Sequence, residues 1–169
     1  MMAKGGKVDF GDLQKFRDKL EKNFSRSQVD LFIESCAKEL AARLLAKVIK
    51  RTPVGQYSAE SGKKGGTLRR GWTGGKGGSG SAYANSLQVQ KFGDVFVIEI
   101  INPVEYAPYV EFGHRQDPGR FVPAIGKRLK KDWVEGKFML TISESEVKAD
   151  APKILEKKVK KKLGEIFNG

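Results

Sequence analysis

A regular apolar stripe in the first third of the chain constrains the fold more than any other feature of the sequence. Its members recur in alternating steps of three and one: Val29, Phe32, Ile33, Cys36, Ala37, Leu40, Ala41, Leu44, Leu45, Val48 and Ile49. Such spacing places every one of these side chains on one face of an α-helix of about 23 residues, roughly 35 Å long. The stripe therefore predicts a long helix whose apolar face a second layer of the protein covers.

Local signals at both ends support this helix. Ser25 and Ser27 stand just before it, and serine is a residue type that caps helix N-termini. Pro53 follows its end and disfavours helical geometry at Thr52. Cys36 lies within the stripe, so we interpret it as a small buried hydrophobic residue rather than a reactive thiol. It is the only cysteine, which excludes an intramolecular disulfide framework.

A glycine-rich, cationic segment comes next. Nine of the nineteen residues at positions 62–80 are glycine, and no acidic residue occurs from position 61 to 93. We expect a flexible loop over residues 58–82, anchored to the body of the protein by Leu68 and Trp72. Its candidate DNA-facing side chains are Lys63, Lys64, Arg69, Arg70 and Lys76. Their contacts with phosphates would be salt-sensitive and independent of base sequence, and an ordinary solvent-exposed loop is the alternative.

Two runs in the middle of the chain predict a β-hairpin. Apolar and polar residues alternate over positions 87–91, and Phe92-Gly93-Asp94 then turns the chain. Residues 95–101 return as a β-branched run. This second run is apolar at nearly every position, so we expect both of its faces to be covered.

Further strands are expected at residues 68–73 and at either 119–122 or 136–140. The last third of the chain returns to helical spacing, with lysines on its polar face that we interpret as solvated. Within it, Pro152 marks either a kink or, with Asp150 as the cap, a fresh helix start. The sequence thus predicts an α+β fold: an antiparallel sheet, a long N-terminal helix packed on it, and a basic amphipathic C-terminal helix.

The chain divides into three parts on these patterns. Residues 1–24 form an N-terminal arm with a short amphipathic helix, and residues 25–140 form the α+β core domain with its glycine-rich loop. Residues 141–169 form the C-terminal helix. Ser143 with Glu146 is typical of a capping box at the start of that helix.

A turn rich in proline and aromatic residues lies between the hairpin and the C-terminal helix. Residues 105–124 hold three prolines, two glycines, four aromatic residues and the only histidine. Each proline removes a backbone donor and each glycine relaxes φ, so a fixed turn is favoured over a long helix or strand. We expect one or two helical turns over residues 106–112, ended by Gly113 as a C-cap. The candidate subunit-interface residues are Tyr106, Tyr109, Glu111, Phe112, His114 and Arg115.

A catalytic or metal site was weighed for the same turn. Glu111, His114 and Asp117 lie close in sequence and carry groups suited to metal binding or acid–base catalysis. A catalytic metal usually needs three protein ligands, however, and the chain has a single histidine and no recognisable nucleophile–base spacing. We therefore expect no enzymatic activity, no metal and no cofactor. Glu111 is instead a candidate to pair with Arg115 or with a cation of a neighbouring subunit.

Three pieces of sequence, in order, carry a resemblance to a known family. They are Thr52-Pro-Val-Gly55 followed by Leu68-Arg-Arg-Gly-Trp72, then Tyr106-Ala-Pro-Tyr-Val-Glu-Phe-Gly-His-Arg115, then Trp133-Val-Glu-Gly-Lys-Phe-Met-Leu140. Together they resemble the tail-completion (head–tail joining, minor tail) proteins of tailed double-stranded DNA bacteriophages and related phage-tail-like particles. The resemblance spans roughly residues 25–168, and the long glycine-rich insertion is its least secure part.

This resemblance implies a structural protein of the virion neck or tail, assembled in the cytoplasm of the bacterial host. The expected form is a homo-oligomeric ring, a hexamer, with heterologous contacts between copies. Such a ring would complete the tail tube, join it to the head connector or stopper protein, and surround a basic lumen through which double-stranded DNA passes. In the resembled family, the aromatic turn is a fold signature with no known chemistry.

Net charge supports a polyanionic partner but leaves a second function open. The formal charge of +12 attracts nucleic acid, and it would equally keep an assembling protein soluble. A free, non-specific nucleic-acid-binding domain that uses the glycine-rich loop and the lysine-rich helix is the alternative. No apolar run approaches the ~18 to 20 residues of a membrane span, so we expect no membrane partner.

Overall fold

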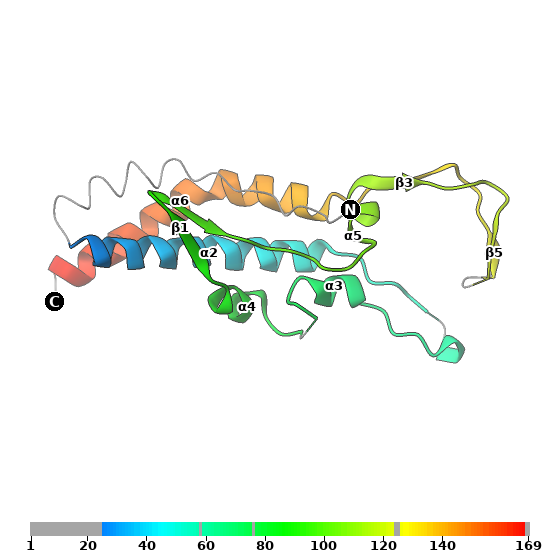
Figure 1. Ribbon diagram of the computed structural model, residues 1–169, viewed down its shortest axis with the longest axis horizontal. Coiled ribbons are helices and arrows are strands. Elements are labelled where there is room, and N and C mark those ends of the chain that lie inside the picture. Colours follow the sequence, from blue (N-terminus) through cyan, green and yellow to red (C-terminus); the bar gives the residue numbers. More distant parts are fainter. Residues whose placement is uncertain (1–24, 58, 76, 124–125, 168–169) are drawn as a thin grey trace.

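A computed structural model describes residues 25–57, 59–75, 77–123 and 126–167 (Figure 1). The short helix predicted within the first 24 residues and the side chain of Lys76 lie outside this described part. Within it, no helix offers the long apolar run that a bilayer-crossing segment requires.

Two long helices, α2 (Arg26–Arg51) and α6 (Met139–Phe167), lie side by side and form the frame of the molecule (Figure 1). Ten of the eleven residues of the apolar stripe are buried in α2, and Ile49 is half-buried, which confirms the predicted helix and its inner face. Cys36 is fully buried, as predicted, and burial raises the pKa of its thiol to about 11.

Two short helices, α3 (Thr67–Gly71) and α4 (Gly80–Ser86), lie on the side of α2 opposite α6 (Figure 1). The short 3₁₀ helix η1 (Ala59–Ser61) is exposed and lies away from α2, in the loop that leads from α2 to α3. Helix α4 crosses α2 closely, because a Cβ atom on Gly80 would lie 2.8 Å from the Cβ atom of Leu45. Leu68 and Trp72 are buried in the same core, as predicted for the anchors of the glycine-rich loop.

The prediction of a strand at residues 68–73 is wrong, because most of this segment forms α3. Leu68, Gly71 and Trp72 are all buried, and positions i, i+3 and i+4 share one face only on a helix. On a strand, Gly71 would point to the opposite side. The helical conformation therefore brings all three residues onto the core at once.

The predicted hairpin is confirmed. Strand β1 (Val89–Phe92) pairs antiparallel with β2 (Val95–Ile98), and Gly93-Asp94 forms a two-residue turn in which Gly93 has φ +59°. The prediction that both faces of the second strand are covered is wrong. Val95 is exposed and the rest of β2 is only half-buried, because the hairpin packs on α2 with one side.

The remaining strands form two further two-stranded sheets rather than extensions of the first. The pairs are β3 (Gly113–Arg115) with β6 (Trp133–Glu135), and β4 (Phe121–Val122) with β5 (Lys127–Arg128). Of the two alternatives for a late strand, residues 119–122 contain β4, whereas residues 136–140 lead into α6. The α+β class with a long N-terminal helix and a C-terminal helix is confirmed.

Helix α5 (Ala107–Phe112) is the short helix predicted in the proline- and aromatic-rich turn. Gly113 follows it with φ +83°, a conformation that favours glycine, and its N–H donates to the carbonyl of Tyr109. The predicted C-cap is therefore confirmed.

Helix α6 begins four residues earlier than the predicted capping box. Ser143 lies inside the helix, where its Oγ donates to the carbonyl of Met139 over 2.6 Å. The helix also continues through Pro152, so the fresh start at Asp150 is wrong. A proline removes one backbone hydrogen bond and bends a helix, and Figure 1 shows the two halves of α6 running in different directions.

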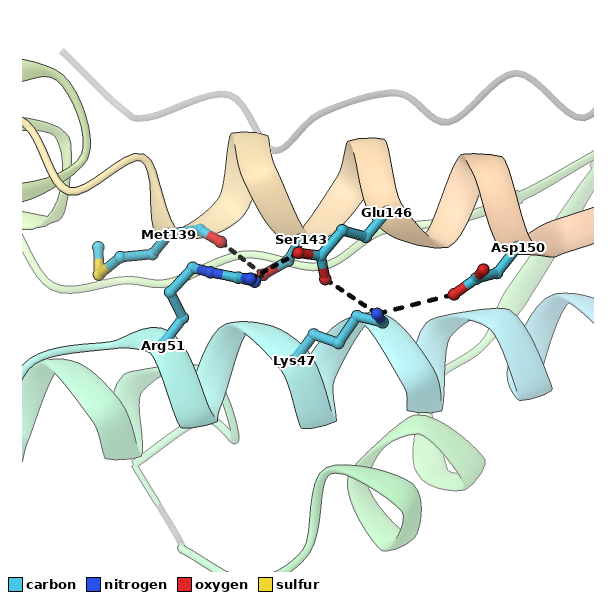
Figure 2. Close-up of polar contacts among 6 residues, drawn as sticks. All are labelled: Lys47, Arg51, Met139, Ser143, Glu146 and Asp150. Carbon is cyan, nitrogen blue, oxygen red and sulfur yellow. Dashed lines mark hydrogen bonds and ion pairs between the residues drawn. The ribbon is translucent and has the colours of Figure 1, made fainter.

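A ladder of charged side chains holds α2 to the first half of α6 (Figure 2). Lys47 Nζ lies 2.9 Å from one carboxylate oxygen of Glu146, and Arg51 Nη2 lies 2.6 Å from the other. Arg51 also donates to Ser143 Oγ, and Asp150 lies 3.7 Å from Lys47. The hydrogen bond between Lys47 and Glu146 lowers the pKa of the carboxyl and raises the pKa of the ammonium.

This ladder predicts a pH-dependent contribution to stability. Since the pKa of Glu146 is lowered on folding, its contribution is complete above the ordinary value of 4.5 and is lost as the pH falls through the folded value. The raised pKa of Lys47 limits the contribution only above 10.5. We expect Glu146→Gln to lower the melting temperature at pH 7, and the difference from the parent to shrink as the pH falls below the ordinary carboxyl pKa of 4.5.

Thermal unfolding followed by circular dichroism from pH 3 to pH 8 measures this difference. The matched control is Glu99→Gln, because Glu99 is exposed and forms no ion pair with another described residue. A difference between Glu146→Gln and the parent that is independent of pH would contradict the assignment.

Candidate functional site

A buried joint closes the C-terminal end of α2. The side chain of Thr52 is fully buried; its Oγ1 donates to the carbonyl of Val48 over 2.6 Å and accepts from Trp72 Nε1 over 2.8 Å. Arg69 donates from Nε and Nη2 to the carbonyl of Thr52 over 3.1 and 2.7 Å. The two sequence pieces at residues 52–55 and 68–72 therefore meet as one hydrogen-bonded unit.

Asn102 connects this joint to the chain that leads into α5. It is buried, and its Nδ2 donates to the carbonyl of Leu68 over 2.8 Å while its Oδ1 accepts from the N–H of Val104. A Cβ atom on Gly71 would lie 2.2 Å from Asn102 Oδ1, so glycine is what allows this close approach. Local sequence pattern does not reveal this role of Asn102, because its partner Leu68 lies 34 residues earlier.

A second joint sits at the N-terminus of α6 and is built on Glu111. This carboxylate is 6% exposed and accepts from the N–H of Leu140 and the N–H of Thr141, each over 2.9 Å. Thr141 Oγ1 donates to it as well, over 2.8 Å. A negative charge on free N–H groups at a helix start is a favourable cap. The predicted ion pair between Glu111 and Arg115 is wrong, because both carboxylate oxygens of Glu111 accept hydrogen bonds from the start of α6.

Two glycines bring the backbones of this joint together. A Cβ atom on Gly113 would lie 2.4 Å from the carbonyl oxygen of Val134, and one on Gly136 would lie 2.4 Å from that of Glu111. The N–H groups of Lys137 and Phe138 also donate to carbonyls of α5. Helix α5, the start of β3, the end of β6 and the start of α6 are thereby fixed to one another.

Several exposed apolar side chains belong to the elements that meet at the second joint, namely α5, β6 and the start of α6. We call this set the aromatic patch: Tyr106, Tyr109, Phe112, Trp133, Phe138 and Ile142, each between 42 and 58% exposed. It holds six of the thirteen large apolar side chains that are exposed in the described part of the chain. Single exposed apolar residues are ordinary, whereas several on elements that are fixed to one another make this region a candidate interaction surface.

The aromatic patch joins residues that are distant in sequence. Tyr106, Tyr109 and Phe112 were predicted as candidate interface residues from the turn alone. Trp133 and Phe138 were not, although they belong to a piece that carries the family resemblance. The approach of the Trp133 ring to Gly113 and the hydrogen bond from the Phe138 N–H to the carbonyl of Glu111 could not be inferred from spacing.

The other candidate interface residues take supporting positions. Glu111 lies beneath the patch as the helix cap. His114 is half-buried on β3, its ring meets that of Tyr109 edge-on at 5.8 Å, and its Nδ1 has no hydrogen-bond partner among the described residues. Arg115 is exposed at the end of β3. Within the described residues, no three of the His, Cys, Asp and Glu side chains come together as possible metal ligands.

The structure separates the candidate DNA-facing cations into two groups. Lys63 and Lys64 are exposed, whereas Arg69 is half-buried and committed to Thr52. Arg70 is exposed but donates to the carbonyl of Gly65 and to the hydroxyl of Thr67. The two arginines therefore order the loop, and among the described candidates Lys63 and Lys64 are left to face a partner.

Comparison with protein families shows which family the chain belongs to. Residues 14–113, more than half of the chain, match the family described as HK97-gp10-like, "Bacteriophage HK97-gp10, putative tail-component". The chain belongs to this family. The match includes all of the first joint and all of α5, and it confirms the resemblance to phage tail proteins. Searches of curated proteins and of solved structures found no match.

Family membership supports a structural role in the bacteriophage tail and a location in the tail of the virion. It also gives the joints a meaning. The sequence pieces that resemble the family are the pieces that close the ends of α2 and α6, so they maintain the fold on which the aromatic patch is displayed.

The second joint generates a prediction about stability. Glu111→Ala leaves two backbone N–H groups at the start of α6 without their acceptor. Since hydrogen bonds to a buried charged group are among the stronger ones, we expect a loss of about 2 to 4 kcal/mol in the free energy of unfolding. Urea denaturation measures this loss.

The matched control is Glu105→Ala, because Glu105 is exposed and precedes the same short helix. Glu111→Gln keeps one acceptor oxygen and should fall between the parent and the alanine variant. Equal stability of Glu111→Ala and Glu105→Ala would show that the carboxylate is not the cap of α6.

Proposed function

We propose that this phage tail protein is a ring-forming subunit of the neck, which completes the tail tube and joins it to the head connector. The aromatic patch is the observation that carries the proposal. Its side chains are exposed in the single chain, yet the backbone beneath them is fixed by the Glu111 joint. Exposed aromatic residues on a preorganised backbone bind a partner with little loss of conformational entropy.

In this proposal the partners are further copies of the chain and the proteins stacked on the ring. Heterologous contacts between copies close into a ring, for which we propose six copies. The connector or stopper protein would lie on one side and the tail tube on the other. Assembly would take place in the cytoplasm of the bacterial host. The role is structural rather than catalytic, which agrees with the use of Glu111 as a helix cap.

The cationic loop supports a DNA-facing position within such a ring. Lys63 and Lys64 are exposed on the loop that follows α2, and Figure 1 shows this loop projecting from the same end of the helix pair as α5. We propose that it faces the lumen. Weak, sequence-independent attraction to phosphates suits passage, because tight contacts with bases would hold the DNA back.

One observation favours the alternative function, a free nucleic-acid-binding domain. Lys153, Lys157, Lys160 and Lys161 are exposed on α6, and their spacing places them on one helical face. This stripe would bind phosphates without any ring. Mass photometry separates the two functions, since the ring requires higher oligomers and the alternative predicts a monomer that binds DNA at moderate salt.

The aromatic patch predicts the effect of removing one aromatic side chain. Tyr109→Ala should weaken association between copies, because the 58% exposed tyrosine lies in the patch, while the melting temperature should stay close to that of the parent. Sedimentation over a concentration series measures the association. The matched control is Phe92→Ala, because Phe92 is similarly exposed on the β1–β2 hairpin outside the patch. Equal effects of the two substitutions would remove the patch from the interface.

The cationic loop predicts a separate phenotype. Replacing Lys63 and Lys64 by Glu should leave folding and ring formation intact, since both side chains are exposed, but lower the infectious titre in a phage that depends on this gene. DNA binding by the purified protein should lose salt dependence corresponding to about two phosphate contacts. The matched control replaces Lys153 and Lys157 by Glu. A fall in titre confined to this control would favour the α6 stripe over the loop.

A further inference from the structure

Residues 113–123 and 126–135 form an arm that leaves the body of the molecule beside α5. Figure 1 shows it projecting beyond the helices, with β3 and β6 at its base and β4 and β5 towards its tip. No described residue between Arg115 and Trp133 is buried. A two-stranded ribbon of this kind is of marginal stability by itself in water, which indicates that the arm acts against another surface.

The arm nevertheless has a defined direction. Beyond the β3–β6 pairs, the N–H of Gln116 donates to the carbonyl of Asp132 over 2.9 Å, and the N–H of Gly119 donates to that of Leu129 over 2.8 Å. The N–H of Leu129 returns a bond to the carbonyl of Arg120 over 2.9 Å. Backbone pairing therefore continues from the base towards the tip, and the glycine contacts at Gly113 fix the base to the second joint.

The tip combines one large apolar side chain with positive charge. Phe121 is 51% exposed on β4. Its neighbours along the two strands include exposed cations on both sides: Arg120, Lys127, Lys130 and Lys131. A surface that binds this tip should therefore offer aromatic area together with carboxylates.

The aromatic patch offers both. Glu105 precedes Tyr106, and Glu135 lies two residues after Trp133 on β6, on the same side of that strand. Both are exposed, and neither forms an ion pair with another described residue. On the long helices, by contrast, carboxylates such as Glu34, Glu39 and Glu146 are paired with lysine or arginine.

We propose that the arm tip of one copy docks on the aromatic patch of the next copy in the ring. Phe121 lies against the patch, and the tip cations face Glu105 and Glu135. This inference rests on the proposed ring and names the contact that builds it. The arm cannot reach its own patch, because both stand on the same joint and the arm points away. Nine residues at ~3.3 Å each could reach at most about 30 Å, and the bend between β3 and β5 shortens this reach (Figure 1).

Mixed-chain disulfide formation tests this contact. Two chains of different length are prepared in a Cys36→Ala background, one with Phe121→Cys and the other with Tyr109→Cys, then mixed and oxidised. We expect a disulfide-linked heterodimer at least about tenfold above the control pair, because docking raises the effective concentration of the two thiols. The control pairs Phe121→Cys with Phe92→Cys, an exposed position outside the patch.

Charge exchange provides an independent measurement. Replacing Arg120 and Lys127 by Glu should weaken association, and so should replacing Glu105 and Glu135 by Lys. Combining all four replacements in one chain should restore association, since each ion pair is then re-formed with opposite sign. All of these side chains are exposed, so the melting temperatures should stay close to that of the parent.

The outcomes separate the two proposals. Higher oligomers that give no tip–patch disulfide above the control, and no restoration by charge exchange, would overturn the arm contact and leave the ring standing. A tip that becomes linked to a connector or tail-tube protein but not to Tyr109→Cys would also overturn it. A chain that stays monomeric at its highest soluble concentration, and that is present as a single copy in assembled tails, would overturn both the arm contact and the ring.

Discussion

Burial of one apolar face of α2 is the interaction on which the rest of this structure depends. Each large side chain of that stripe contributes on the order of 1.5 to 3 kcal/mol when removed from water. Helix α6 also has a long apolar face, but fewer of its side chains are fully buried than those of α2. The β1–β2 hairpin, α4 and α6 all pack against α2. The sheets are correspondingly small, because the helix pair supplies most of the core.

The two joints explain why short, separated pieces of sequence identify the family. Thr52 forms hydrogen bonds with Trp72 and Arg69, and Glu111 accepts hydrogen bonds from the first backbone amides of α6. Each residue stabilises the fold only when its distant partner is present. A pair of weak motifs in the correct order is therefore a stronger indication than either motif alone. The joints also hold rigid the backbone from which the tail protein presents its aromatic side chains.

Much of this fold could be predicted from local pattern, and the failures share a physical cause. The stripe of α2, the turn at Gly93 and the C-cap at Gly113 depend on residues close in sequence, and all three were predicted correctly. The start of α6 was misplaced because its cap comes from a glutamate 28 residues earlier. Arg69 was counted among the free cations because its acceptor is a backbone carbonyl, which no side-chain pattern reveals. Half of the aromatic patch was missed since the backbone contacts that assemble it are long-range.

The anchoring of the arm at Gly113 and Gly136 has a consequence for how tail proteins of this kind can diverge. Both ends of the arm are fixed to the second joint, and no described residue between Arg115 and Trp133 is buried. Residues can therefore be inserted or removed in matched pairs across the ribbon without disturbing the helices, provided that the alternation of faces is kept. In the proposed ring, the length of the arm would set the separation between neighbouring copies, while the second joint stays unchanged.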